Sequence, residues 1–291
     1  MHCIKKAVFP VAGFGTRFLP VTKANPKEML PIVDKPLIQY AVEEAVRAGI
    51  DDIIFVTSSS KRAIEDHFDR NFELEMRLQE QNKSQLLDIV RHVSPKNVKF
   101  TYIRQNQPLG LGHAILCAAH VVGNSPFAVL LADDLIDDSV LPCLKDMTEK
   151  FTQYGQSIIA VQSVPWEDVH RYGVIKIAAL LETLASIQDI IEKPDLAVAP
   201  SNFAAIGRYI FTPEIFSCLQ QTSADISGEI QLTSGIRHLL ALETVQAYRF
   251  HGKRYDCGSK LGYLQAVVDM GRQHLEVGQA FCNYLQNLQI T

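Results

Sequence analysis

Apolar residues in the first half of the chain form short runs, and the segments between these runs have helical spacing. The runs predict strands at residues 7–11, 53–57, 98–103, 127–132 and 157–162. The intervening segments predict helices at 37–48, within 61–90, at 112–121 and at 141–154. Strands that alternate with helices in this way favour an α/β fold, in which helices cover both faces of a doubly wound, mostly parallel sheet. In such a sheet, ligands bind beyond the carboxyl ends of the strands.

The pattern changes after residue 162. Short β-like runs at 173–177, 187–191 and 203–211 are broken by Pro, Asp and Ser, and they predict a small mixed β subdomain. Helical spacing returns at 213–221 and 230–242, a last strand is expected at 245–250, and the closing stretch 261–288 is helical. We therefore expect one domain over residues 1–265, with halves of about 1–160 and 161–260. The C-terminal helical segment at 261–291 would pack on the core or on a partner subunit.

One long polar segment, residues 72–93, interrupts the alternation of strands and helices. Its apolar residues recur at roughly helical spacing, at Leu74, Leu78, Leu86, Leu87 and Val90. An apolar stripe on an otherwise charged helix is typical of an amphipathic helix at the protein surface. We therefore expect a surface helix in this segment.

Composition limits the class of protein. With 291 residues, of which 47% are hydrophobic, the chain can bury a full core as one large domain or two tightly joined ones. Its net charge is −4 and its Lys and Arg residues are scattered, so we expect no nucleic-acid partner. No apolar run approaches about 18 residues, so we expect no signal peptide and no membrane span. The six cysteines never form C-x-x-C, which favours small buried side chains in a cytoplasmic protein over a zinc or disulfide framework.

A glycine loop and two cations follow the first expected strand. Gly13 and Gly15 let the backbone approach an anion closely and turn successive N–H groups toward it. Arg17 and Lys27 add positive charge before the next expected helix, so this order of elements suits a phosphate. The spacing does not match a P-loop, and Phe18 stands where a dinucleotide-binding loop needs its third glycine. The glycine spacing therefore argues against an NAD-dependent dehydrogenase.

The glycine loop belongs to a longer set of motifs. The chain reads A-G-F-G-T-R at 12–17, P-K-E-M-L-P at 26–31 and D-K-P-L-I-Q-Y at 34–40, and in this it resembles the sugar-phosphate nucleotidyltransferases. The resemblance continues, in the family's order, through G-L-G-H-A at 110–114, L-A-D-D at 131–134, E-K-P at 192–194, G-E-I-Q-L-T at 228–233 and D-C-G-S-K-L-G-Y at 256–263. It therefore covers nearly the whole chain.

The resemblance implies that a sugar-1-phosphate oxygen attacks the α-phosphorus of a nucleoside triphosphate and releases pyrophosphate. An insertion like 72–93 is typical of the branch that uses UTP and glucose-1-phosphate and is lacking in the thymidylyl branch, so we expect UDP-glucose as the product. No hexapeptide array follows, which weighs against the bifunctional GlcNAc-1-phosphate enzymes. Residues 1–160 would then bind the nucleotide and 161–260 the sugar. Because the family commonly forms dimers or tetramers, the resemblance also implies a homo-oligomer.

Two highly charged anions meet in this reaction, so the site needs a metal ion and several cations. Asp133 ends an apolar strand, and Asp256 follows the last expected strand. Mg²⁺ typically takes one or two carboxylates together with phosphate oxygens. By the resemblance, these two aspartates hold Mg²⁺. From the residues alone, Asp133 and Asp134 also fit a solvated turn, since Asp137 and Asp138 follow.

The resemblance also assigns the nucleotide contacts. Gln105 would read uracil with its side-chain amide, which carries both a donor and an acceptor, and Lys27 would lie near the α-phosphate. The other expected contacts are backbone groups of Ala12 and Gly13 at uracil, Gly110 beside the nucleoside, and Gly15, Thr16 and Arg17 at the triphosphate. Glu28 either contacts the base or ribose or forms a structural ion pair, and both interpretations stay open.

By the resemblance, four residues contact the sugar-1-phosphate: Gly173, Glu192, Lys193 and Asn202. Glu192 would accept hydrogen bonds from sugar hydroxyls, and Lys193 would hold the sugar phosphate against repulsion from the triphosphate. Together with Arg17 and Lys27, Lys193 is expected to supply the catalytic charge. His113 is expected to be a structural histidine.

The chain departs from the family's pattern at two places. The segment between Tyr172 and Glu192 is short and unusually apolar at 177–181, and the strand before the metal ligand ends in L-A-D-D in place of L-P-D. Two rival functions are a sister enzyme that uses dTTP or another sugar phosphate, and a protein that senses nucleotide sugars without catalysis. The insertion at 72–93 argues against the first rival, and the retained charged residues argue against the second.

Overall fold

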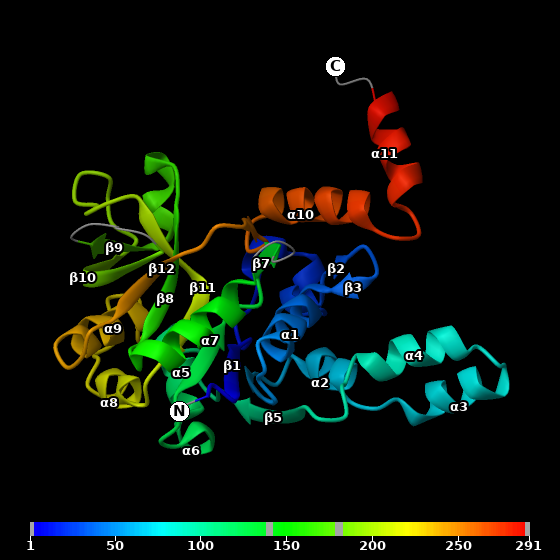
Figure 1. Cartoon of the computed structure of the whole chain (residues 1–291), viewed down its shortest axis with the longest axis horizontal. Coiled ribbons are helices and arrows are strands. Elements are labelled where there is room, and N and C mark those ends of the chain that lie inside the picture. Colours follow the sequence, from blue (N-terminus) through cyan, green and yellow to red (C-terminus); the bar gives the residue numbers. More distant parts are fainter. Residues whose placement is uncertain (1–2, 138–141, 178–182, 289–291) are drawn as a thin grey trace.

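The computed structural model describes residues 3–137, 142–177 and 183–288. Within these residues the main sheet has nine strands in the order β5-β4-β1-β6-β11-β8-β12-β10-β9 (Figure 1). The strands are β1 (Lys6–Pro10), β4 (Asp52–Thr57), β5 (Lys99–Arg104), β6 (Phe127–Leu130), β8 (Ile158–Ser163), β9 (Gly173–Ile177), β10 (Leu184–Glu192), β11 (Phe203–Phe211) and β12 (Gln246–Arg249).

The sheet is mixed. Strands β5, β4, β1 and β6 are parallel, as the alternation of strands and helices predicts. Strand β11 runs antiparallel to both β6 and β8, and β10 runs antiparallel to β12 and β9. The strands expected to form a small β subdomain therefore continue the main sheet to its far edge. The apolar positions 178–181 and the predicted helix start at Leu141 lie outside the described residues.

Helices cover both faces of the sheet, because successive side chains of each buried strand point to opposite sides. Phe9 of β1 packs in the core under α1 (Leu37–Arg47), α2 (Arg62–Phe68) and α7 (Cys143–Tyr154). Val8 packs in the core on the other face, against α5 (Gly110–Cys117), α8 (Glu214–Gln220) and α9 (Leu232–Leu240). Short α6 (Ala119–Val122) follows α5. This arrangement leaves the carboxyl ends of β1, β4, β5 and β6 on one edge.

The polar insertion forms two helices in place of the single surface helix expected. Helices α3 (Phe72–Glu80) and α4 (Ser84–His92) form a hairpin that projects from the body of the molecule (Figure 1). The chain turns at Asn82, whose φ of 52° lies in the left-handed region that Asn tolerates better than most residues. Leu78 and Leu87 are both buried at 8% exposure. The apolar stripe is thus split between two short helices.

A two-stranded ribbon lies beside the main sheet, and the sequence pattern predicted neither of its strands. Strand β13 (Lys253–Asp256) pairs antiparallel with β7 (Asp134–Asp137). A further pair, β2 (Pro31–Ile32) and β3 (Lys35–Pro36), precedes α1. After β13 the chain continues into α10 (Lys260–Gln273) and then α11 (Gly278–Asn287), which points away from the body (Figure 1). No helix in the described ranges is long and apolar enough to cross a membrane.

Candidate active site

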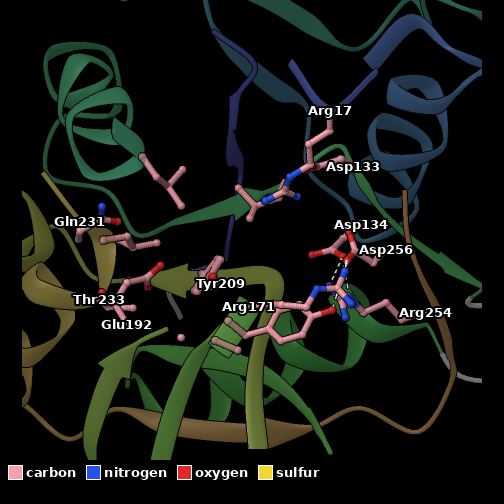
Figure 2. Close-up of a pocket in the computed structure, with 16 residues that line it drawn as sticks. Arg17, Asp133, Asp134, Arg171, Glu192, Tyr209, Gln231, Thr233, Arg254 and Asp256 are labelled. Carbon is pink, nitrogen blue, oxygen red and sulfur yellow. Dashed lines mark hydrogen bonds and ion pairs between the residues drawn. The ribbon is translucent and has the colours of Figure 1, made fainter. Parts of the chain in front are cut away.

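Two neighbouring cavities open at the carboxyl ends of the parallel strands, and both are bordered by Leu111. We call the first, of about 350 Å³, the glycine cavity; its lining includes Ala12, Gly13, Gln105, Gly110 and Glu229. We call the second the carboxylate cavity; its lining includes Arg17, Asp133, Arg171, Gly173, Glu192 and Asp256 (Figure 2). Nine of the fifteen residues expected from the motifs therefore divide between two adjoining spaces. The other six line neither cavity: Gly15, Thr16, Lys27, Glu28, Lys193 and Asn202.

Two glycines line the glycine cavity, and one of them cannot be replaced by a larger residue. A Cβ on Gly13 would meet no atom within 4 Å, so the backbone after β1 is open to an approaching group. Gly110 has φ of 92°, and a Cβ there would lie 2.8 Å from Cβ of Glu229. Both the left-handed backbone and the lack of space exclude a side chain at Gly110.

The glycine loop supports the first cation. Gly15 has φ of 66°, and a Cβ on it would lie 3.2 Å from Cβ of Lys27, so the lysine stem packs against the loop. Thr22 Oγ1 donates a 2.8 Å hydrogen bond to the Gly15 carbonyl. Thr16 begins the 3₁₀ turn Thr16–Phe18 and lines a separate cavity next to Lys23.

Lys27 forms an ion pair with Asp133. Its Nζ lies 2.6 Å from Asp133 Oδ2, and both side chains are about three-quarters buried. Burial alone would lower the pKa of Lys27, but the charges of Asp133 and Glu28 outweigh it and raise that pKa. Burial would raise the pKa of Asp133, but the charge and hydrogen bond of Lys27 lower it overall. Both groups are therefore ionised at neutral pH.

Asp256 faces the same space from the other strand of the ribbon. Its Oδ2 accepts hydrogen bonds from Arg171 at 2.5 Å and from the Tyr172 hydroxyl at 3.2 Å. A Cβ on Gly258 would lie 2.9 Å from Asp133 Oδ2 and 3.0 Å from Asp256 Oδ1. Only glycine leaves this space open between the two carboxylates.

The donor set fits a magnesium ion that is completed by substrate. The described residues contain no group of three or more His, Cys, Asp or Glu side chains that could hold a metal by itself. Asp133 and Asp256 supply two carboxylates around the space next to Gly258. Mg²⁺ commonly takes one or two carboxylates and fills its other positions with water and phosphate oxygens.

Asp134 has a different partner from its neighbour. Its side chain is buried, and Oδ1 lies 2.6 Å from Arg254 while Oδ2 accepts from the Gly207 amide at 2.9 Å. Behind it, Arg208 donates to the carbonyls of Leu131 and Asp134, on both sides of Asp133. These contacts hold the turn that carries Asp133.

The sugar residues predicted from the motifs lie partly in the carboxylate cavity. A Cβ on Gly173 would lie 2.8 Å from Thr233 Cγ2 and 3.5 Å from Glu192 Oε2, so glycine keeps this side open. Lys193 follows at the end of β10 with φ of 44° and a half-exposed side chain. Asn202 lies outside both cavities, and its amide donates to Ser163 Oγ and to the Val164 carbonyl.

Glu28 is 2% exposed and forms an ion pair with Lys61 at 2.9 Å. Of the two roles left open, the structure contains the ion pair. A contact between Glu28 and a nucleotide stays a prediction.

Several residues that line the carboxylate cavity were not predicted, among them Arg171, Tyr209, Gln231, Thr233 and Arg254. Figure 2 shows Gln231, Thr233 and Glu192 on the side of the cavity opposite Asp133 and Asp256. For Gln231 and Thr233, the G-E-I-Q-L-T motif at 228–233 was a usable signal in the sequence. In the structure the Ile230 carbonyl of this motif accepts a 2.9 Å hydrogen bond from the Gly112 amide, which holds the motif beside the cavities.

The sequence pattern of the nucleotidyl transferase family matches residues 6–273. The chain therefore belongs to this family, which confirms the resemblance predicted from the motifs. It is 48% identical over 288 residues to a UTP–glucose-1-phosphate uridylyltransferase of Bacillus subtilis (strain 168), with 99% of this chain and 98% of the relative covered. It is 47% identical over 293 residues to the enzyme of that name from Haemophilus influenzae, with 98% and 99% covered.

Solved structures agree with these relatives. A UTP-bound UGPase from Acinetobacter baumannii superposes with a TM-score of 0.92 at 45% identity, covering 98% of this chain and all of that one. A UDP-glucose pyrophosphorylase complexed with UDP-glucose superposes with a TM-score of 0.86 at 48% identity, covering 93% of this chain and all of that one. A putative glucose-1-phosphate thymidylyltransferase from Bacillus anthracis, at 24% identity and a TM-score of 0.71, shares the fold.

Proposed function

We propose that this chain transfers a uridylyl group from UTP to glucose-1-phosphate, forming UDP-glucose and pyrophosphate. The observation that carries the proposal is the pair of carboxylates, Asp133 and Asp256, that face one open space in the carboxylate cavity, next to the glycine cavity. Two linked cavities suit two substrates that must react with each other. The full-length relatives that share this activity supply the identities of the substrates.

The reaction needs little covalent chemistry from the protein. A phosphate oxygen of glucose-1-phosphate forms a bond to the α-phosphorus of UTP. At the same time the bond from that phosphorus to the oxygen that bridges it to the β-phosphorus breaks, and this oxygen leaves as part of pyrophosphate. Positioning and charge stabilisation therefore carry the rate. Lys27 and Arg17 supply charge to the triphosphate, and Lys193 holds the sugar phosphate.

The other roles follow the two cavities. Gln105 and the backbone of Ala12 and Gly13 bind uracil in the glycine cavity, where they line the wall. Gly110 lies against the nucleoside, and Gly15 and Thr16 support the triphosphate. In the carboxylate cavity, Gly173 and Glu192 bind the sugar, and Asn202 would contribute a hydrogen bond from outside that cavity.

Asp133 and Asp256 would hold Mg²⁺. When bound, this ion supplies positive charge to the phosphate oxygens and helps to align the two substrates. Lys27, which is already paired with Asp133, is held at the same point and adds its charge beside the metal.

The protein would act as a homo-oligomer in the cytoplasm, with the C-terminal segment at 261–291 as a subunit contact. Helix α10 supports this, because Leu261 and Leu264 are 68% and 58% exposed on a helix that ends the folded body.

The test is pyrophosphate release from purified protein with a grid of nucleoside triphosphates and sugar-1-phosphates. We expect UTP with glucose-1-phosphate to react fastest and EDTA to stop the reaction. Asp133→Ala and Lys193→Ala should each nearly abolish turnover, whereas Lys176→Ala, a matched change at an exposed lysine outside both cavities, should not. If dTTP or another sugar phosphate reacts fastest, the substrate assignment is wrong. If no pair reacts while UDP-glucose still binds, the protein is a sensor of nucleotide sugars.

A further inference from the structure

His113 contacts Gln105, the side chain proposed to bind uracil, and the proposed function gives His113 itself no role. Gln105 follows β5 and is 8% exposed, with its backbone amide bonded to the Thr57 carbonyl at 2.8 Å. Its side-chain nitrogen, Nε2, lies 3.1 Å from the Gly110 carbonyl oxygen and 2.9 Å from Nδ1 of His113. His113 projects from the first turns of α5 and does not itself line the glycine cavity.

The partners fix which way the amide points. A carbonyl oxygen can only accept a hydrogen bond, so the atom of Gln105 that faces Gly110 must be the NH₂ group. The same group meets His113 Nδ1, which must then be the unprotonated ring nitrogen, with the imidazole proton on Nε2. Each hydrogen of the NH₂ group is thereby used within the protein.

We infer that His113 is a positioning residue that makes Gln105 present only an acceptor, its Oε1 oxygen, to the base. This rests on the proposed role of the glycine cavity as the uracil site. No described residue donates a hydrogen bond to Oε1, and Gln105 lines the cavity, so Oε1 is the atom left for a ligand. The sequence predicted that the amide offers both a donor and an acceptor to the base. On this inference it offers the acceptor alone.

An amide that offers only an acceptor selects among pyrimidines. The imide N3–H of uracil donates to Oε1, and thymine presents the same N3–H. Cytosine has an unprotonated N3 at this position, so its lone pair would face the lone pairs of Oε1. Turning the amide over would relieve that repulsion but would set Oε1 against the Gly110 carbonyl oxygen, and it would also require the proton of His113 to move from Nε2 to Nδ1. His113 therefore raises the cost of accepting CTP and has no direct effect on the choice between UTP and dTTP.

The test removes the acceptor at position 113 and compares three nucleotides. We would measure kcat/KM for UTP, CTP and dTTP at saturating glucose-1-phosphate in the wild type and in His113→Leu. The ratio of UTP to CTP should fall about tenfold, the effect of one hydrogen bond, while the ratio of UTP to dTTP stays within about twofold. His67→Leu is the matched control, because His67 also contacts a glutamine, Gln39 at 3.0 Å, away from both cavities. It should change neither ratio.

Other outcomes overturn the inference. A ratio of UTP to CTP within about twofold of wild type means that Gly110 alone orients the amide, and an equal fall in both ratios means that His113 only supports the shape of the cavity. His113→Ala gives the same comparison if the leucine variant does not fold. If the wild type releases no pyrophosphate with any substrate pair, the proposed function fails, and the ratio of dissociation constants for UTP and CTP then tests His113 alone. Failure of the wild type to discriminate UTP from CTP in that binding assay also overturns it.

Discussion

The buried ion pair between Arg208 and Glu44 offers a sharp test of how the turn around Asp133 is held. Arg208 is 1% exposed and Glu44 is 4% exposed, so neither charge is solvated by water. Arg208 Nε and Nη2 contact the Glu44 carboxylate at 2.7–3.1 Å, and its other N–H groups donate to backbone carbonyls, including those of Leu131 and Asp134. Among the groups that these hydrogen bonds join to Arg208, the Glu44 carboxylate of α1 is the negatively charged one.

The Glu44→Gln change keeps the size of the side chain and removes its charge. Leaving one partner of a buried pair uncompensated costs about 3–5 kcal/mol, and no cavity is added because the two side chains are nearly isosteric. At about 2–4 °C per kcal/mol for a chain of this size, the thermal midpoint should fall by roughly 6–20 °C. The concentration of Mg²⁺ at half-maximal activity should also rise, because Arg208 holds the carbonyls on both sides of Asp133.

The measurement is thermal and denaturant unfolding of the wild type and three variants. Glu73→Gln is the control, since Glu73 pairs with Arg77 on the surface of α3 with side chains 76% and 69% exposed; it should cost at most about 0.5 kcal/mol. Replacing both buried partners, Glu44→Leu with Arg208→Met, should recover much of the loss because no buried charge remains. A loss below about 1 kcal/mol in Glu44→Gln would refute the reasoning, since a buried guanidinium without its carboxylate should cost several times more.

Three further outcomes are expected. Asp133→Asn should lower the rate of pyrophosphate release at least about 10²-fold while circular dichroism stays unchanged, because the amide no longer supplies negative charge to a metal. Gly110→Ala should raise KM for UTP about tenfold or more, since its φ of 92° and a contact of 2.8 Å to Glu229 Cβ leave no room for a methyl group. Hydrogen bonds from Ser227, Gln231 and the Glu229 amide lower the pKa of Asp225 from 3.8 to about 2, so its carboxylate stabilises the fold above pH 3.8 and loses that effect as the pH falls toward 2. The difference in unfolding midpoint between wild type and Asp225→Ala, measured in urea, should therefore shrink on acidification.

The first half of the chain, residues 1–160, was predictable because its signals are local. The inner parallel strands are buried apolar runs, such as β4, whose residues from Ile53 to Thr57 are all buried. The glycine loop and Asp133 directly follow apolar runs in the sequence, so their place beyond the carboxyl ends of strands also follows from a local pattern. A strand buried on both faces gives an unbroken apolar run that sequence periodicity detects.

The parts that were not predicted depend on contacts between distant segments. Strands β7 and β13 contain four residues each, with charged residues at both ends of the ribbon, and they become strands by pairing with each other. Arg208 and Glu44 are 164 residues apart, and Arg171 and Asp256 are 85 apart. A buried arginine in an apolar strand gives no indication of its partner until α1 is packed on the sheet. The helix break at Asn82 was also missed, because helical spacing alone does not show where a turn divides one amphipathic segment into two.

Both candidate metal ligands are ion-paired within the protein, and this bears on how the site can bind two highly charged substrates. Lys27 neutralises Asp133, and Arg171, from the half expected to bind sugar, neutralises Asp256. A buried carboxylate needs such a partner because an uncompensated charge in a low dielectric is costly. Mg²⁺ and the triphosphate together can replace both halves of the first pair, with the metal on the carboxylate and the phosphate on the lysine. The metal alone would leave Lys27 without a negative partner, and the triphosphate alone would leave Asp133 without a positive one. Binding of the metal should therefore strengthen binding of UTP, and binding of UTP should strengthen binding of the metal. The ion pair thus preserves the geometry of the site and favours nucleotide and metal binding together.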